Sequence, residues 1–174
     1  MSEINTLYKL IVLYMLSEID FSLTNVQIST FFLDQEYTSY FTIQSVLSEL
    51  TEAELIHQEI IQNTSYYTIT PGGEETLGYF KNNISPSIRE DVKKYLRENK
   101  IQLRDEVSVL ADYYRNTSGD ISVRCRVKEK QSDLIDLTIT VPDETQAKAV
   151  CQQWQKKCQS VYAYIMKELR QSEK

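Results

Sequence analysis

Basic residues are missing from a long stretch in the first half of this 174-residue chain. Lys9 and Lys81 are separated by 71 residues that contain neither lysine nor arginine. Residues 1–83 carry eleven acidic and two basic side chains, which gives this half a net charge of −9. Because lysine and arginine supply most sequence-independent affinity for phosphate, this composition argues against a nucleic-acid surface in the first half.

Glycine and histidine are also scarce. The chain has four glycines and a single histidine, His57. The sequence shows no glycine-rich phosphate loop, no metal signature and no nucleophile motif. It therefore predicts a protein that is not an enzyme and that has no catalytic, cofactor-binding or metal-binding residues.

No hydrophobic run is long enough to form a membrane helix. The longest, LIVLYML at residues 10–16, is far short of the roughly 20 residues that a membrane span requires. The start of the chain also lacks the basic residues of a signal peptide. We expect a cytoplasmic protein that does not contact a membrane.

The three cysteines, Cys125, Cys151 and Cys158, are too few for a disulfide framework. Cys151 and Cys158 lie seven positions apart on one apolar helical stripe, a spacing that raises the alternative of a metal or redox site. No histidine or acidic residue accompanies them at ligand spacing, and free cysteine often packs as a small hydrophobic residue. The pattern favours packing.

What the sequence does contain is a sharp change of charge. Residues 84–174 carry fourteen acidic and seventeen basic side chains, a net charge of +3, against −9 for residues 1–83. The change falls near Pro86, and proline opens a helix more easily than it continues one. We therefore expect two domains, residues 1–83 and residues 84–174.

The first half shows three amphipathic helical patterns followed by a hairpin. The first helix is expected to end before Asp20, the second to be capped by Thr24 or Asn25, and the third by Ser39. The second helix has an expected buried stripe of Val26, Ile28, Phe31 and Phe32, and the third one of Ile43, Val46, Leu47 and Leu50. Two short strands, LIHQEII and YYTIT, flank the turn QNTS, and Thr70 and Pro71 open a fourth helix through Phe80. This order predicts a winged helix-turn-helix, with a small helical bundle carrying a hairpin as the alternative.

Two resemblances support this fold. The wing end Tyr67, Ile69, Thr70 and Gly73 resembles the Tyr-x-Ile/Leu-Thr-x-x-Gly of multiple-antibiotic-resistance-type and phenolic-acid-decarboxylase-type winged-helix repressors. Over nearly its whole length, with NTLYKLIVLYML, TSYFTIQSVLSEL and YYTIT-PGG, the chain resembles the uncharacterised bacterial family of domain of unknown function 4364. This resemblance implies a regulator-like winged-helix protein of Gram-positive bacteria and supplies no catalytic residue or ligand.

Two functions follow, and the sequence leaves both open. The resemblance implies a DNA-binding transcriptional regulator, whereas the local charge favours an acidic winged helix that binds another protein. For either partner, the predicted contact residues are those around the third helix: Thr38, Ser39, Tyr40, Thr42, Gln44, Ser45 and Ser48. A homodimer is expected, and it could bring basic residues of the second half alongside DNA, namely Arg89, Lys93, Lys94 and Arg97.

The second half reads as a helix, three antiparallel strands and a long C-terminal helix. EVSVLADYYRN, ISVRCRVKEK and DLIDLTITVP are the expected strands, and the last two alternate apolar and polar residues without error. The helix from Asp143 has an apolar stripe and is expected to cover the dry face of the sheet. On the wet face, Arg124, Arg126 and Lys128 form a possible anion-binding or partner-binding row, with a solvated strand face as the alternative.

The parity of these strands also predicts their register. The apolar residues of both strands are odd-numbered, so opposed residue numbers should have an even sum. The simplest choice is a sum of 264, which sets Lys128 against Asp136 and Arg126 against Thr138. This choice excludes a two-residue loop at Gln131 and Ser132, which would give an odd sum.

Overall fold

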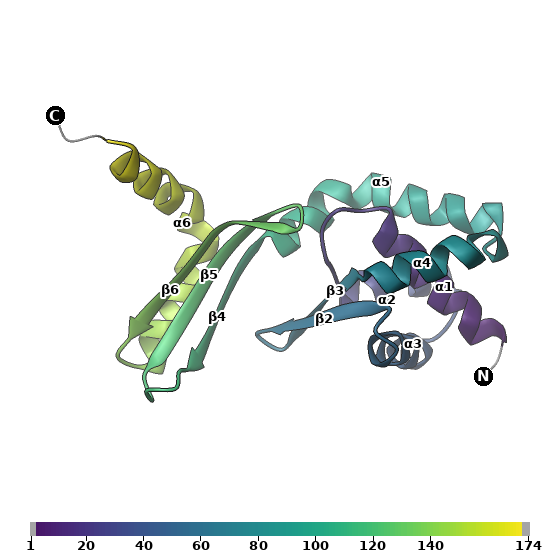
Figure 1. The fold of residues 1–174 in the computed structure, drawn as a ribbon, viewed down its shortest axis with the longest axis horizontal. Helices are drawn as coiled ribbons and strands as arrows, with labels where there is room; N and C mark the ends of the chain where they lie inside the picture. The colour runs from purple at the N-terminus through teal and green to yellow at the C-terminus, as the bar shows by residue number, and fades with distance from the viewer. Residues whose placement is uncertain (1–2, 172–174) are drawn as a thin grey trace. The chain divides into compact units, whose positions relative to one another are not determined.

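A computed structural model describes residues 3–171 and shows a mixed α+β protein (Figure 1). Over these residues the chain forms six α-helices and two three-stranded antiparallel sheets, and it divides into two compact units, residues 1–107 and residues 108–174. The first unit contains α1 (Glu3–Ser17), β1 (Leu23–Thr24), α2 (Asn25–Asp34), α3 (Tyr40–Glu52), β2 (Ile56–Ile61), β3 (Thr64–Ile69), α4 (Pro71–Phe80), a short 3₁₀ turn η1 (Lys81–Asn83) and α5 (Pro86–Ser108). The second contains β4 (Val109–Arg115), β5 (Ile121–Glu129), β6 (Ser132–Val141) and α6 (Glu144–Arg170).

The predicted helix starts of the first unit are confirmed by their caps. The Thr24 hydroxyl accepts a hydrogen bond from the backbone N–H of Gln27, whose side chain accepts in return from the Thr24 N–H. Ser39 accepts from the N–H of Thr42 at the start of α3, and Thr70 accepts from the N–H of Gly73 at the start of α4. Each cap satisfies a backbone donor that has no partner within its own helix.

The core of the first unit confirms one predicted helical stripe and corrects another. Ile43, Val46, Leu47 and Leu50 of α3 are all buried, as expected. In α2 the buried residues include Ile28, Phe31 and Phe32, but Val26 is 70% exposed, so its predicted burial is wrong. Val26 and Ile28 are two positions apart, which is about 200° of rotation around the helix axis. Val26 therefore points away from the side on which Ile28 is buried.

The hairpin of the first unit closes on a two-residue turn. β3 pairs with both β1 and β2, and Ile61 lies opposite Thr64 at the turn. The turn residues Gln62 and Asn63 both have positive φ, 49° and 62°. Turns of this kind match the right-handed twist of the strands they join, and asparagine tolerates the left-handed region better than most residues.

Helix α5 belongs to the first unit. It buries Val92, Leu96, Leu103 and Val107 in the same core as α1–α3. The Tyr95 hydroxyl also donates a 2.9 Å hydrogen bond to the carbonyl oxygen of Gln27 in α2. The boundary between the two units therefore falls between residues 107 and 108. The charge shift had suggested a boundary after residue 83. The two differ because the charge of α5 describes its surface, whereas its buried side chains determine the unit to which it belongs. The helix also runs through Ser108, so the predicted strand EVSVLADYYRN begins only at Val109.

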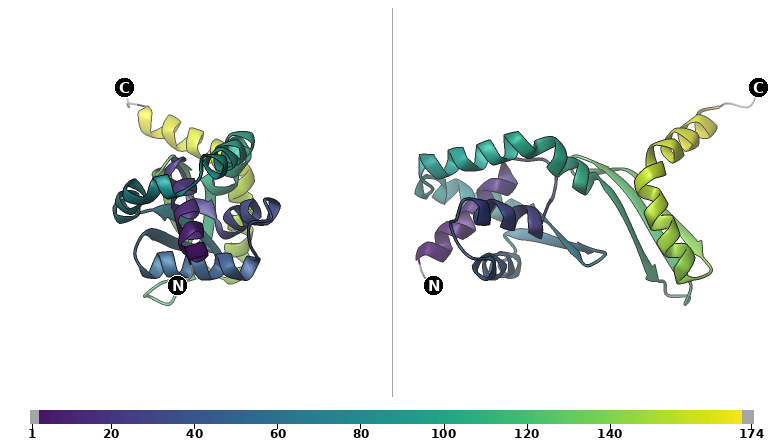
Figure 2. Two further views of the ribbon diagram at one scale, coloured as in Figure 1. Left: turned by 90° about the vertical axis from the view of Figure 1, so that its right-hand side faces the viewer. Right: turned by 180° about the vertical axis from the view of Figure 1, so that it is seen from behind.

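The second unit is a three-stranded sheet of order β4-β5-β6 with α6 packed on one face (Figure 2). Its core joins Ala111, Val123, Cys125 and Val141 of the sheet to Ala147, Cys151, Trp154 and Cys158 of α6. The expected sheet with a helix over one face is present. None of the helices within residues 3–171 is both long enough and apolar enough to cross a membrane.

The register of β5 and β6 differs from the predicted one. Arg126 lies opposite Asp136 and Arg124 opposite Thr138, so the sum is 262 and the predicted value of 264 is wrong. The predicted even sum is correct from Ile121 to Val127, but a bulge after Val127 then sets Lys128 against Asp133. The bulge changes the parity and permits the two-residue loop Lys130–Gln131, in which Lys130 has a φ of 59°.

Candidate interaction surface

The outer side of α3 contains most of the predicted contact residues. Ser39, Tyr40, Ser45 and Ser48 are exposed, whereas Thr38, Thr42 and Gln44 are half-buried. The side chains of α3 that face the core hold the helix in place, so the position of its outer side is fixed by packing. The predicted set is therefore divided into accessible hydroxyls and groups that are partly covered.

Gln44 is bonded within the first unit. Its amide nitrogen donates to Asn25 Oδ1 at 2.8 Å, and its amide oxygen accepts from Asn25 Nδ2 at 2.6 Å. The same nitrogen lies 3.3 Å from Ser29 Oγ. This reciprocal pair ties α3 to α2, and Gln44 must break it before it can read a base edge.

Two aromatic rings dominate the accessible part of α3. Phe41 is 83% exposed, and its ring meets that of Tyr40 edge to face at a centroid distance of 6.0 Å. Phe41 was absent from the predicted contact set. Helical spacing could have identified it, because position 41 lies off the buried stripe of residues 43, 46, 47 and 50.

The cations of residues 1–83 make contacts within the first unit. Lys9 forms an ion pair with Glu49 of α3, and the Lys81 ammonium lies 5.2 Å from the centre of the Tyr14 ring. Exposed carboxylates bracket α3, with Glu36 before it and Glu52 and Glu54 at its end. The outer side of α3 therefore has two aromatic rings near its start and exposed carboxylates before it and at its end.

The basic row of β5 is partly neutralised by its own sheet. Arg124 donates two hydrogen bonds to Asp136, at 2.9 and 2.7 Å, and these hold the pKa of that carboxyl below its usual value. Arg126 is only 7% exposed, and its carbonyl oxygen accepts a 3.1 Å hydrogen bond from the Trp154 indole. The alternation of β5 places Arg124, Arg126 and Lys128 on one face of the strand, as predicted. The guanidinium of Arg124, however, is already paired with Asp136.

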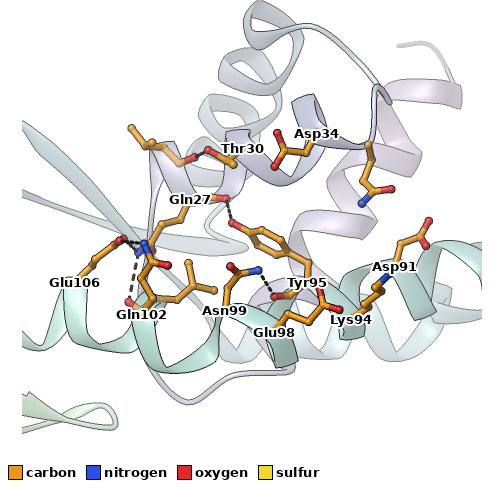
Figure 3. A pocket seen from close by; sticks show the side chains of 13 residues that line it. Gln27, Thr30, Asp34, Asp91, Lys94, Tyr95, Glu98, Asn99, Gln102 and Glu106 are labelled. Atoms are coloured by element: carbon orange, nitrogen blue, oxygen red, sulfur yellow. Dashed lines mark hydrogen bonds between the residues drawn. The ribbon is translucent and has the colours of Figure 1, made fainter.

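A cleft of about 490 Å³ lies between α2 and α5 (Figure 3). Its lining carries four carboxylates and one ammonium: Asp34, Asp91, Glu98, Glu106 and Lys94. Gln27 spans it and donates to Glu106 and to the carbonyl oxygen of Leu103. The sequence pattern did not indicate this cleft, because its two sides are more than fifty positions apart in the chain.

Two tyrosines join α5 to the segments that face it, one in the cleft and one beside it. Burial, with help from Asp34 and Glu106, raises the pKa of Tyr95 to about 12. Burial and the hydrogen bond to Asp91 do the same to Tyr37, whose pKa also lies near 12. Both phenols stay protonated at neutral pH and act as hydrogen-bond donors that brace α5 against α2 and the α2–α3 turn.

The three cysteines are buried in the second unit. Burial, followed by the neighbouring Cys151, raises the pKa of the Cys125 thiol to about 11. Within residues 3–171, no group of three histidine, cysteine, aspartate or glutamate side chains is placed to hold a metal ion.

We expect the thiols of the native protein to react slowly with a thiol reagent between pH 7 and pH 9. The thiolate is the reactive form, and burial disfavours it. The same protein in denaturant should release all three thiols quickly, and the two rates can be compared by absorbance. Rapid modification of Cys151 or Cys158 in the native state, or stoichiometric zinc in purified protein, would contradict the packing role.

These features define an α+β protein with an acidic first unit and a sheet-and-helix second unit. Residues 8–169 match the model of a family described as a domain of unknown function (DUF4364), and the chain belongs to that family. The searches of curated proteins and of solved structures found no match to this chain.

Proposed function

We propose that the first unit is a winged helix-turn-helix. Its element order supports this reading, because α2, a short turn and α3 are followed by the hairpin β2–β3 and by α4. In this assignment α3 takes the place of the recognition helix and the hairpin takes the place of the wing. The small helical bundle with a hairpin, the alternative raised by the sequence, has no need for β1, which pairs with β3 and ties the start of α2 to the wing.

We further propose that the protein is regulatory and that the α3 surface binds another protein. The observation that carries this proposal is Phe41, an aromatic ring exposed on α3 within a stretch, residues 10–80, that contains no lysine or arginine. Aromatic residues commonly anchor protein interfaces, whereas charged residues act mainly at the rim. The matching partner would offer an apolar pocket with basic residues around it, facing Glu36, Glu52 and Glu54.

DNA is the second candidate for the same surface. The exposed hydroxyls of Ser39, Ser45 and Ser48 favour it, because hydroxyls donate to phosphate and contact bases. Against it stand the bonded Gln44 and the contacts that Lys9 and Lys81 make within the unit. A protein partner is therefore more consistent than DNA with the exposed Phe41 ring and the absence of available cations on α3.

Capture of partners on immobilised protein tests the proposal. Phe41→Ser should remove a bound protein that the wild type retains from a bacterial lysate, by at least about tenfold, as expected for loss of an interface anchor. Tyr79→Ser on α4 is the matched control, because Tyr79 is a similarly exposed ring on another helix. The control should retain the partner.

DNA binding supplies the opposing outcome. If Ser45→Glu and Ser48→Glu abolish binding to DNA while Phe41→Ser leaves all protein capture unchanged, the α3 surface is a DNA-binding surface and the protein-partner proposal is wrong.

A further inference from the structure

Five cations form a row along one side of α5. We name this row the α5 stripe: Arg89, Lys93, Arg97, Lys100 and Arg104. Their intervals of four, four, three and four positions place them on one side of an α-helix. The last four are exposed and Arg89 is half-buried. At 1.5 Å per residue the stripe is about 22 Å long.

Three of the five negative charges of α5 lie on a different side of the helix, whereas Glu90 and Asp105 lie beside the stripe. Asp91, Glu98 and Glu106 line the cleft against α2 (Figure 3). Among the described residues of the stripe, one ion pair is seen, between Arg104 and the adjacent Asp105 at 3.7 Å. Both of those side chains are exposed, and such pairs contribute little. The stripe therefore keeps a positive surface of its own.

Arg89 differs from the other four cations of the stripe. Its Nε atom is buried, and no acceptor within residues 3–171 forms a hydrogen bond with it. Buried donors are almost always paired in folded proteins. Because the protein covers this atom, Arg89 is the least accessible member of the stripe, and the four exposed cations are the ones open to a ligand.

This concentration of charge is unusual for its surroundings. The first unit carries sixteen acidic and eight basic side chains, a net charge of −8, and five of the eight cations belong to the stripe. A surface that serves only solubility mixes the two signs. On the stripe's side of α5 the five cations outnumber the two neighbouring acidic side chains, Glu90 and Asp105.

We propose that the α5 stripe binds the phosphate backbone of double-stranded DNA. Each DNA strand carries one phosphate per 3.4 Å of helix axis, so a duplex segment as long as the stripe offers more phosphates than the stripe has cations. Arginine and lysine both bind phosphate, and a rigid helix suits a duplex that is stiff over this length.

The acidic remainder of the unit does not prevent this contact. α5 and α3 lie on opposite sides of the first unit (Figures 1 and 2). Charges separated by more than about 8 Å in solvent are largely screened at physiological ionic strength. A duplex on the stripe would be held without sequence preference and would leave Phe41 accessible to a protein partner. The inference therefore goes beyond the function proposed for α3.

The test uses the full-length protein and a fluorescent 30-base-pair duplex of mixed sequence, titrated at several salt concentrations. If each of the four exposed cations neutralises one phosphate, the log–log salt slope is about −3.6. The triple variant Lys93→Gln, Arg97→Gln and Lys100→Gln should weaken binding at low salt by at least about tenfold and flatten the slope by about 2.7. The matched control removes three exposed lysines of α6, Lys156→Gln, Lys157→Gln and Lys167→Gln, and should bind within about twofold of wild type.

Several outcomes would overturn the proposal. These are no duplex binding at low salt, equal losses in the stripe variant and the α6 control, or tighter binding of single-stranded DNA or RNA than of the duplex. Phe41→Ser and Ser45→Glu should leave duplex binding intact. Loss of protein capture alone would therefore identify failure of the function proposed for α3, and loss of stripe dependence alone would identify failure of this one.

Discussion

Replacing Gly73 with alanine is expected to destabilise the first unit by about 3 kcal/mol or more, at the upper end of the usual effect of overpacking. Gly73 is buried near the start of α4, and an added Cβ would lie 2.1 Å from the carbonyl oxygen of Leu55 and 2.8 Å from Ile69 Cγ1. That carbonyl oxygen already accepts a hydrogen bond from the Thr70 N–H, so it cannot move without disturbing the start of the helix. Urea unfolding followed by circular dichroism measures the loss.

Gly78→Ala provides a control in the same helix. A Cβ at Gly78 meets nothing within 4 Å, and alanine favours a helix interior over glycine. This variant should stabilise the unit by about 0.5 to 1 kcal/mol, because alanine also restricts the unfolded chain. Equal effects of the two substitutions would mean that the contact with Leu55 does not limit the size of residue 73.

The sequence predicted most accurately those features that depend on a few neighbouring residues. Thr24, Ser39 and Thr70 all cap helices as expected, because a cap requires only a short polar side chain and the N–H groups of the next turn. The buried stripe of α3 was also correct, because it follows from helical spacing alone. The family was identified from longer stretches of the same kind and is confirmed over residues 8–169.

Features set by long-range packing were predicted less well. Alternation in β5 and β6 determined which residues share a face, but the bulge after Val127 shifted the pairing near the turn. Charge composition suggested a boundary near Pro86, whereas the burial of Leu96 and Leu103 in the first core places α5 in the first unit. Neither the bulge nor that burial has a signal within a window of a few residues.

The candidate surfaces show the same limit. Gln44 qualified as a contact residue by helical position, but its pairing with Asn25 of α2 depends on how two helices meet. The sequence alone indicated the basic side of α5. That its acidic residues line a cleft against α2 could be recognised only from the structure. One side of α5 thus carries the row of cations and the other side lines the acidic cleft. The net charge of the unit does not reveal this arrangement.

Phe31→Ala is expected to lower the stability of the first unit by about 3 to 5 kcal/mol, as large-to-small substitutions of buried phenylalanine usually do. The Phe31 ring is fully buried and packs against three others, with centroid distances of 5.4 Å to Phe32, 5.8 Å to Tyr37 and 5.4 Å to Tyr95. It therefore joins α2 to α5, and its removal opens a cavity where these helices meet. The loss is a large fraction of the 5 to 15 kcal/mol that typically stabilises a folded protein.

The second unit supplies an internal reference for this measurement. The protein has one tryptophan, Trp154, which lies in the separate core of the second unit and reports on that unit by fluorescence. In urea, Phe31→Ala should shift the unfolding of the first unit, followed by circular dichroism, and leave the Trp154 transition in place. Phe41→Ala, the same substitution at an exposed ring, should change neither by more than about 0.5 kcal/mol. If the Trp154 transition moves together with the first, the two cores unfold as one cooperative unit and the expected independence is wrong.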